Sequence, residues 1–167
     1  MHDWSEIILR LGVATLAGAA IGLNRDLHGK PIGLRTLGIV SLASAMVVLL
    51  STGSGEAARF SDATSRIIQG ILTGIGFLGA GVIFRTEGHA RVRGLTSAAC
   101  TWLTACIGII CGAGDWRIVA VGLTITCVIL VWGGPTERWL HQRLGGKDTP
   151  ARTPPDQKPG SPLAPGD

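Results

Sequence analysis

The chain has 167 residues, of which 46% are hydrophobic and only 16% are Asp, Glu, Lys or Arg, and its formal net charge is +4. A soluble globular domain carries about 25% charged residues, so this composition argues against one and indicates a membrane-embedded domain. The basic excess does not point to nucleic acid, because the Lys and Arg residues stand in short clusters between apolar runs and not in one patch with aromatic residues.

Five apolar segments follow one another along the chain, each close to the roughly 20 residues that cross ~30 Å of hydrocarbon as a helix. We therefore predict an all-α, polytopic transmembrane helix bundle of about five spans. Four spans with one re-entrant segment is the alternative. The predicted spans are residues 4–23, 34–52, 67–84, 95–112 and 116–132.

The first segment begins with the acidic residues Asp3 and Glu6 and continues into GAAIGL. A secretory signal would have a basic start and a cleavage site after a short apolar centre, so a retained span is expected. Gly18 and Gly22 have the small-x-x-x-small spacing that lets membrane helices approach closely.

The third segment contains GIGFLGAGVIFR, residues 74–85, whose first six residues satisfy G-x-G-x-x-G. A dinucleotide site needs a strand before this motif and a helix after it, whereas here both flanks are apolar and no loop intervenes. We interpret the glycines as helix-packing residues at the centre of the bundle; a broken helix lining a path is the alternative. The glycines assigned to helix packing are Gly18, Gly22, Gly70, Gly74, Gly76, Gly79 and Gly81.

Two short charged loops join spans one and two (GLNRDLHGKPIGLRT) and spans three and four (RTEGHARVRGLTSAA). They either set the topology through headgroup contacts or form a shared polar site, in which Asp26 would be compensated by Arg25, Arg35 or Arg93. The candidate functional residues in these loops are Arg25, Asp26, Lys30, Arg35, Arg85 and Arg93.

The Lys and Arg residues predict the orientation. Of the 15 in the chain, eleven lie in these two loops and after the fifth span, and three lie in the other two loops. By the positive-inside rule the C-terminus is cytoplasmic and the N-terminus is outside. We expect a transmembrane domain over residues 1–135 and a polar, largely disordered cytoplasmic tail over residues 136–167, rich in proline.

No pattern typical of catalysis, a metal or a cofactor stands out. The four cysteines lie in the last two spans without C-x-x-C spacing, and the histidines are scattered. No acidic residue lies near the centre of a span, where ion pumps usually carry one. We predict a protein that is not an enzyme and that has no cofactor or metal site.

Three ordered stretches resemble the MgtC/SapB family of bacterial inner-membrane proteins: GLNRDLHGKPIGLRT, RIIQGILTGIGFLGAGVIFR and VRGLTSAACTWLTACIGIICGAG. The resemblance implies a multi-pass protein of the bacterial inner membrane. The best-known member of the family is linked to magnesium limitation and virulence, is not regarded as a magnesium transporter, and is associated with restraint of the F-type ATP synthase.

This chain departs from the family pattern at several positions. Asn24, Leu37 and Thr96 replace residues that are common in the family, and the stretch before Arg66 lacks a proline. It looks like the short form without the soluble C-terminal domain, so the virulence and ATP-synthase roles transfer weakly.

Two functional hypotheses follow. In the first, the chain modulates membrane protein partners under magnesium limitation or stress, with the F-type ATP synthase as the partner that the resemblance implies, and its contacts are the lipid bilayer, such a partner, and a second copy in a homo-oligomer. In the second, it is a small transporter or channel for a divalent cation or another small ion.

Overall fold

The computed structural model describes residues 3–52, 61–85 and 92–144. These residues form five helices, α1 (Trp4–Leu27), α2 (Leu34–Ser51), α4 (Asp62–Val82), α5 (Leu95–Ala113) and α6 (Trp116–Leu144), with a short hairpin of β1 (Phe84–Arg85) and β2 (Val92–Arg93) between α4 and α5. All five helices are long and apolar enough to cross a membrane. The prediction of five helical spans is confirmed, and the third span is one continuous helix without a break or a re-entrant turn.

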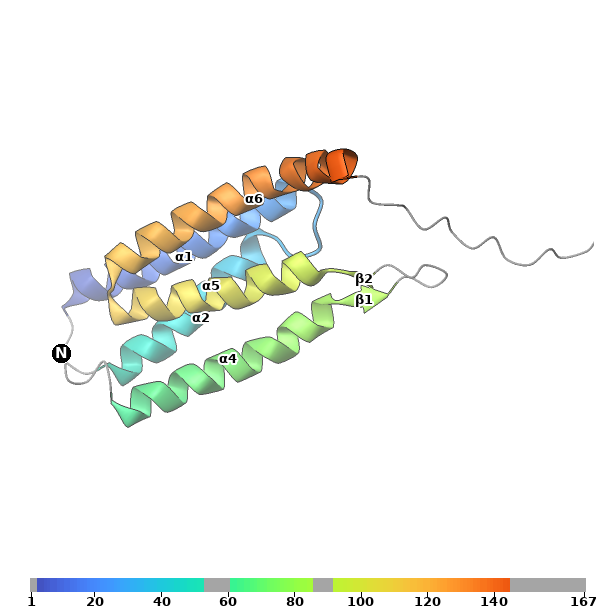
Figure 1. Ribbon diagram of the computed structural model, residues 1–167. Helices are drawn as coiled ribbons and strands as arrows, with labels where there is room; N and C mark the ends of the chain where they lie inside the picture. Colours follow the sequence, from blue (N-terminus) through green and yellow to red (C-terminus); the bar gives the residue numbers. More distant parts are fainter. Residues whose placement is uncertain (1–2, 53–60, 86–91, 145–167) are drawn as a thin grey trace, which may run out of the picture.

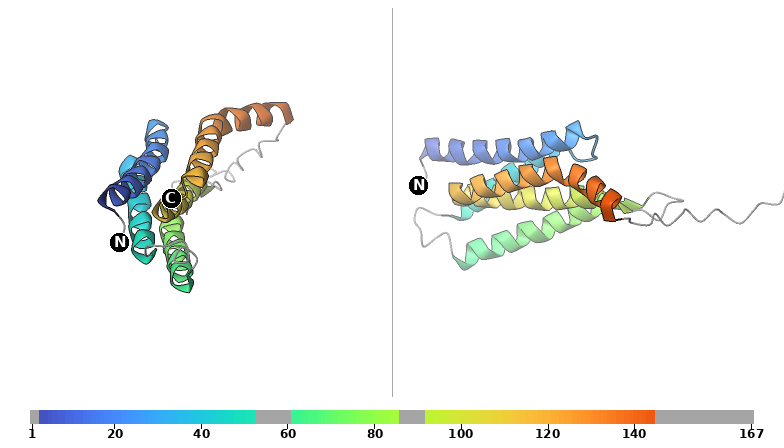
Figure 2. Two further views of the ribbon diagram at one scale, coloured as in Figure 1. Left: turned by 90° about the vertical axis from the view of Figure 1, so that its left-hand side faces the viewer. Right: turned by 45° about the horizontal axis from the view of Figure 1, so that its top comes forward.

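The helices run up and down beside one another, and successive helices point in opposite directions (Figure 1). α1, α2 and α5 pack most extensively, α4 contacts mainly α5, and α6 makes few contacts with α5 and α1. Viewed end-on, α1 and α2 form one layer and α6, α5 and α4 form the other (Figure 2). Of the residues in the membrane-spanning stretch of α5, 56% are buried, whereas in the corresponding stretch of α4 only 11% are buried. α5 is therefore the central helix, and the expectation that the third span is central differs from the structure.

Local sequence explains where the helices begin and end. The Asp3 side chain accepts a hydrogen bond from the Trp4 backbone N–H at 2.9 Å and so caps α1. Ser61 caps α4 in the same way through the Thr64 N–H at 3.2 Å. α5 ends at Gly114, whose φ of +81° is the left-handed conformation that favours glycine, and its N–H bonds to the carbonyls of Ile110 and Cys111.

Two boundaries differ from the expected ones. α4 starts at Asp62, five residues before the predicted span, and α6 continues through Pro135 to Leu144. Figure 2 shows that the C-terminal part of α6 bends away from the bundle, and the sequence offers Gly133, Gly134 and Pro135, the residue types at which helices usually kink. The expected boundary at residue 135 thus falls inside α6, and most of the expected tail, residues 145–167, lies outside the described residues.

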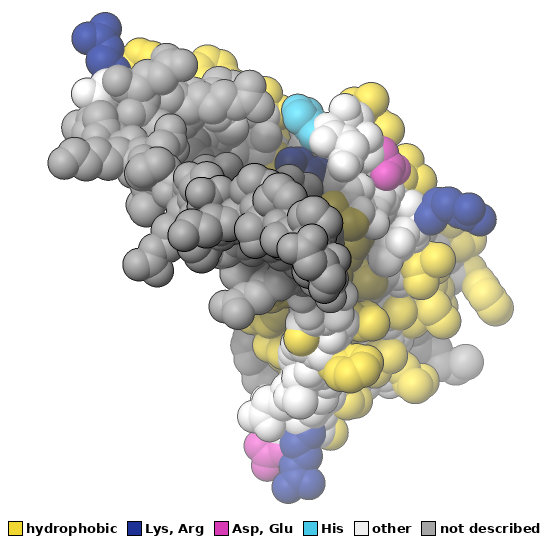
Figure 3. All heavy atoms as spheres, turned by 90° about the vertical axis from the view of Figure 1, so that its right-hand side faces the viewer, with side chains coloured by type: hydrophobic (Ala, Val, Ile, Leu, Met, Phe, Trp, Pro, Cys, Tyr) yellow, Lys and Arg dark blue, Asp and Glu magenta, His cyan; other side chains and the backbone are white. Residues whose placement is uncertain are grey.

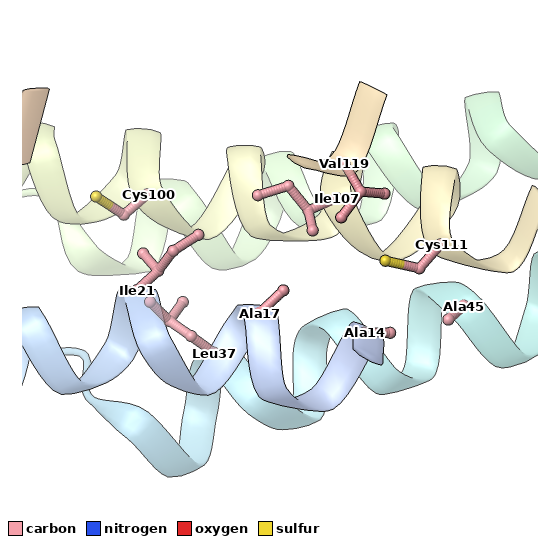
Figure 4. Packing of buried hydrophobic residues seen from close by; sticks show 9 residues of the cluster. All are labelled: Ala14, Ala17, Ile21, Leu37, Ala45, Cys100, Ile107, Cys111 and Val119. Atoms are coloured by element: carbon pink, nitrogen blue, oxygen red, sulfur yellow. The ribbon is translucent and has the colours of Figure 1, made fainter. Parts of the chain in front are cut away.

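The core is built from small side chains. Nine buried apolar residues from α1, α2, α5 and α6 form one cluster, and Figure 4 shows them pointing into the space between these helices. They are Ala14, Ala17, Ile21, Leu37, Ala45, Cys100, Ile107, Cys111 and Val119. Small residues allow close helix approach, which is how membrane helices gain packing energy. Large apolar side chains such as Leu16, Leu50 and Trp132 are instead exposed on the flanks, as expected for a surface that faces lipid.

Candidate functional site

Two arginines of α1 mark the two ends of the bundle. The Arg25 end is where α1 finishes and α2 and α5 begin, and the Arg10 end is where α1 begins and α2 and α5 finish. Figure 3 looks at the Arg25 end, with apolar side chains over the described flank and charged side chains of both signs at its edges. Of the candidate charged residues from the sequence, all six lie at the Arg25 end, since the α1–α2 loop and the β1–β2 hairpin meet there (Figure 1).

The neighbours Arg25 and Asp26 point to different surroundings. Arg25 is buried, with 5% of its surface exposed, and its Nη2 donates a hydrogen bond to the Ser97 hydroxyl of α5. Asp26 is exposed and its Oδ2 accepts a hydrogen bond of 2.8 Å from the Leu34 N–H, the first residue of α2. The carboxylate therefore caps α2 from eight residues away, which is favourable at the positive end of a helix.

The turn between α1 and α2 is shaped to allow this cap. The Lys30 N–H bonds back to the Arg25 carbonyl at 3.1 Å, and Gly29 takes a φ of +61° in the turn. A Cβ on Gly33 would lie 2.5 Å from Asp26 Oδ2, so only glycine leaves room for the carboxylate at this place. Gly29 and Gly33 are thus part of the capping geometry.

Of the three arginines expected to compensate Asp26, the structure describes the side chains of two, Arg25 and Arg35. Within the described part of the chain, no ion pair joins Asp26 to Arg25 or Arg35. Lys30 and Arg35 are exposed. The antiparallel hairpin pairs Phe84 with Arg93 and Arg85 with Val92, which places the backbones of Arg85 and Arg93 at this end; their side chains lie outside the description.

The N-terminus of α5 completes the Arg25 end. Its N-cap is Gly94, with φ +93° and no side-chain hydrogen bond to the first turn. The first backbone bond across this turn runs from the Ala98 N–H to the Gly94 carbonyl at 2.8 Å. Ser97, the partner of Arg25, lies in this first turn.

The Arg10 end holds a buried arginine with partners on two helices. Arg10 is 4% exposed; its Nη1 donates to the Gly112 carbonyl at 2.7 Å and its Nη2 pairs with Glu6 one helical turn earlier. Its guanidinium also lies against Gly114, where an added Cβ would come within 2.7 Å of Arg10 Cζ. The i, i+4 spacing of Glu6 and Arg10 was a signal in the sequence, whereas the contact with α5, a hundred residues later, had none.

The glycines fall into two groups. On α1, an added Cβ would lie 2.5 Å from the Leu37 carbonyl oxygen at Gly18 and 2.5 Å from Leu34 Cα at Gly22, so both sit directly against α2. Sequence reasoning missed two equivalents on α5, Gly108 and Gly112; an added Cβ at Gly112 would lie 2.6 Å from the Ala45 carbonyl oxygen. Their own small-x-x-x-small spacing was the signal that could have identified them.

The α4 glycines have a different environment. Gly79 is in ordinary contact with Ala98, at 3.7 Å for an added Cβ. Within the described residues, an added Cβ at Gly70, Gly74, Gly76 or Gly81 would meet no other atom within 4 Å. These four glycines do not serve close packing inside the described chain.

Four hydroxyl-bearing residues of α2 and α5 lie inside the bundle. Ser41, Ser44, Thr101 and Thr104 are buried. Thr101 donates to the Ser97 carbonyl of its own helix at 2.9 Å, whereas Ser41 Oγ and Thr104 Oγ1 have no hydrogen-bond partner among the described residues. Over the same residues, no group of three or more His, Cys, Asp or Glu side chains could hold a metal ion.

Sequence comparison relates this chain to a known protein family and to several known proteins. The model of the MgtC family matches residues 11–139. SrpB of Synechococcus elongatus is 39% identical over 150 residues, which cover 84% of this chain and 82% of SrpB. MgtC of Salmonella typhimurium is 42% identical over 121 residues, covering 72% of this chain but 49% of MgtC. YhiD of Escherichia coli, described as a candidate magnesium transporter, is 35% identical over 131 residues, covering 75% of this chain and 60% of YhiD.

No solved structure matches the chain. The chain spans most of SrpB but about half of MgtC. The family match and the five helices able to cross a membrane indicate a multi-pass protein of the bacterial inner membrane. This chain belongs to the MgtC family.

Proposed function

We propose that this chain is a non-enzymatic modulator that acts on membrane protein partners when magnesium is limiting or the cell is under related stress. The Arg25 end faces the cytoplasm in this proposal, because the loops richest in Lys and Arg meet there. The relative YhiD, described as a candidate magnesium transporter, supports the link to magnesium, and the proposal extends that link to this chain.

The sign of the buried charge is the observation that carries the proposal. Among the described residues, the buried charged side chains are Arg10 and Arg25, one near each end of the bundle. Mg²⁺ is bound by oxygen ligands, usually one or two carboxylates and several waters. A buried guanidinium repels a divalent cation strongly where the dielectric is low. Arg10 is paired with Glu6, but Arg25 has no carboxylate partner among the described residues. A buried, unpaired guanidinium favours a modulator over a path for Mg²⁺ between α1, α2 and α5.

The outer face of α4 supports contact with a partner. Gly70, Gly74 and Gly81 lie at i, i+4 and i+11, on one side of the helix with Phe77, which is 82% exposed. Glycine weakens a helix by about 1 kcal/mol relative to alanine. In a membrane this loss of helix stability is compensated where another helix packs closely against the glycine. We propose that this α4 face, defined as Gly70, Gly74, Phe77 and Gly81, receives a transmembrane helix of a partner protein.

One observation favours the rival function of a small transporter. The hydroxyl oxygens of Ser41 on α2 and Thr104 on α5 are buried and have no hydrogen-bond partner among the described residues, although buried polar atoms normally find one. Hydroxyl groups of this kind could contact an ion or a water on its way through the bundle. This second candidate predicts flux, which the modulator does not.

The two functions are separated by reconstitution. Purified protein in liposomes loaded with a Mg²⁺-sensitive dye should give no uptake above protein-free liposomes under an imposed gradient. Saturable uptake that is lost in Thr104→Val, with unchanged folding, would establish the transporter and contradict the modulator.

The partner contact is tested by photo-crosslinking in living cells. A photoreactive amino acid at Phe77 should give a discrete adduct with a membrane protein, and the same amino acid at Leu16, which is 71% exposed on α1, should not. Mass spectrometry then distinguishes an F-type ATP synthase subunit, a second copy of this chain and another protein. Adducts to lipid alone at both positions would contradict contact through the α4 face.

A further inference from the structure

The first turn of α5 carries a buried cation that lacks a full set of partners. Arg25 reaches it from the last turn of α1 and gives one N–H to Ser97. Its Nε is buried and has no hydrogen-bond partner among the described residues. A guanidinium has five N–H donors, and a buried charge without compensation is unfavourable by several kcal/mol.

The helix end beside this cation is itself positive. The N–H groups at the start of a helix have no partner within it, and they carry roughly half a positive charge. Gly94 supplies no side-chain cap, and the first turn of α5 contains no acidic residue. The nearest acidic residue along the chain, Asp26, is exposed and holds the Leu34 N–H. A buried cation and a helix N-terminus therefore lie side by side.

The other end of the same helix shows what a compensated arginine looks like. Arg10 lies at the C-terminal, negative end of α5, where the Gly112 carbonyl accepts its hydrogen bond and Glu6 supplies a carboxylate. The dipole of α5 stabilises a cation there and opposes one at Ser97, although the C-terminal end of α1 favours Arg25, which lies in its last turn. Both arginines are buried to a similar extent, so the difference lies in their partners and not in their exposure.

We infer that the Arg25 end holds an anion-binding site for a phosphate group. The site consists of the Arg25 guanidinium, the Ser97 hydroxyl and the backbone N–H groups of the first turn of α5. Guanidinium donors and helix N-terminal amides are the groups that bind phosphate in proteins. Thr96, next to Ser97, is exposed, so this turn reaches the surface. The inference goes beyond the proposed function, which assigns no ligand.

Two sources could supply this phosphate group. Arg25 lies in the last turn of a helix able to cross the membrane, which is the level at which basic residues meet lipid headgroups. Inorganic phosphate from the solvent has the same chemistry. The experiment therefore has one arm for each source.

In the first arm, thermal unfolding of the detergent-purified full chain is followed while inorganic phosphate is titrated at constant ionic strength. In the second, native mass spectrometry measures retention of phosphatidylglycerol against zwitterionic phosphatidylcholine. Both arms compare wild type with Arg25→Gln, Ser97→Ala and the control Arg35→Gln, whose arginine is exposed.

Saturable stabilisation by phosphate, or selective retention of phosphatidylglycerol, is expected for wild type and Arg35→Gln. Arg25→Gln should weaken it by about tenfold or more, as for the loss of a charge-assisted bond, and Ser97→Ala should weaken it less. Ser97→Ala keeps the test valid if Arg25→Gln does not fold. The same response in all variants, or no response in either arm, would overturn the inference.

Discussion

The glycines of α5 and those of α4 have opposite surroundings. Gly108 and Gly112 sit against the backbone of α2, whereas Gly70 and Gly74 meet nothing within 4 Å in the described chain. On α5, glycine is the only residue that lets the two helices approach so closely. On α4, glycine weakens the helix and gains no contact within the described chain. The difference separates a structural core, α1 with α2 and α5, from a face that is open to other molecules.

The largest expected effect comes from enlarging a packed glycine. In Gly112→Leu the side chain has to separate α2 from α5, because even its Cβ would lie 2.6 Å from the Ala45 carbonyl oxygen. Overpacking typically destabilises by about 1–3 kcal/mol, occasionally more, and we expect at least the upper end. The matched variant Gly74→Leu should unfold within about 0.5 kcal/mol of wild type, as expected for a surface substitution. Thermal unfolding in detergent measures both, and equal losses would erase the distinction between the two groups.

Replacing Arg10, which contacts the C-terminal end of α5, should have the second-largest effect on stability. Arg10→Gln takes the charged donor from the Gly112 carbonyl and ends the pairing with Glu6. Hydrogen bonds to charged groups contribute about 1.5–3 kcal/mol, and we expect a loss in this range. Arg35→Gln, at an exposed arginine, serves as the control. A variant as stable as wild type would mean that Arg10 does not hold the end of α5.

The cap on α2 is smaller in effect. Asp26→Ala removes the acceptor of the Leu34 N–H, and loss of a helix N-cap costs about 1 kcal/mol. Asp26→Asn keeps an acceptor oxygen and should retain most of the stability. If both variants unfold like wild type, the carboxylate has another role than capping.

The smallest expected effect is a gain in stability from a substitution on the exposed face of α4. Gly74→Ala should stabilise the purified chain by up to about 1 kcal/mol, because alanine is the better helix former and its Cβ meets nothing within the described chain. Gly18→Ala should destabilise it, because the same Cβ would lie 2.5 Å from the Leu37 carbonyl oxygen. Thermal unfolding should therefore show stability changes of opposite sign for Gly74→Ala and Gly18→Ala. A loss of stability in both variants would show that the Gly74 face of α4 is packed in the purified protein.

The sequence predicts the helices well because crossing hydrocarbon requires long apolar runs whatever their partners are. The spacing of Gly18 and Gly22 likewise predicts close approach. The spacing does not say which helix approaches. The dense glycines of α4 therefore suggested a central helix, although all of them except Gly79 are exposed. The partners of Arg10 and Asp26 also lie beyond sequence reasoning: both are backbone groups, Gly112 C=O and Leu34 N–H, and any residue type supplies those.

The central claim is that the α4 face serves a partner, whereas the packed glycines of α1 and α5 serve the fold. Its most direct test is growth in low-magnesium medium of a strain lacking this chain and complemented with wild type or Gly74→Leu, with membrane level and thermal stability measured in parallel. The account predicts that Gly74→Leu reaches the membrane and unfolds like wild type, yet grows like the strain without the chain. Growth like wild type with a fully stable Gly74→Leu protein would contradict it, as would a strain that loses the chain without any growth defect.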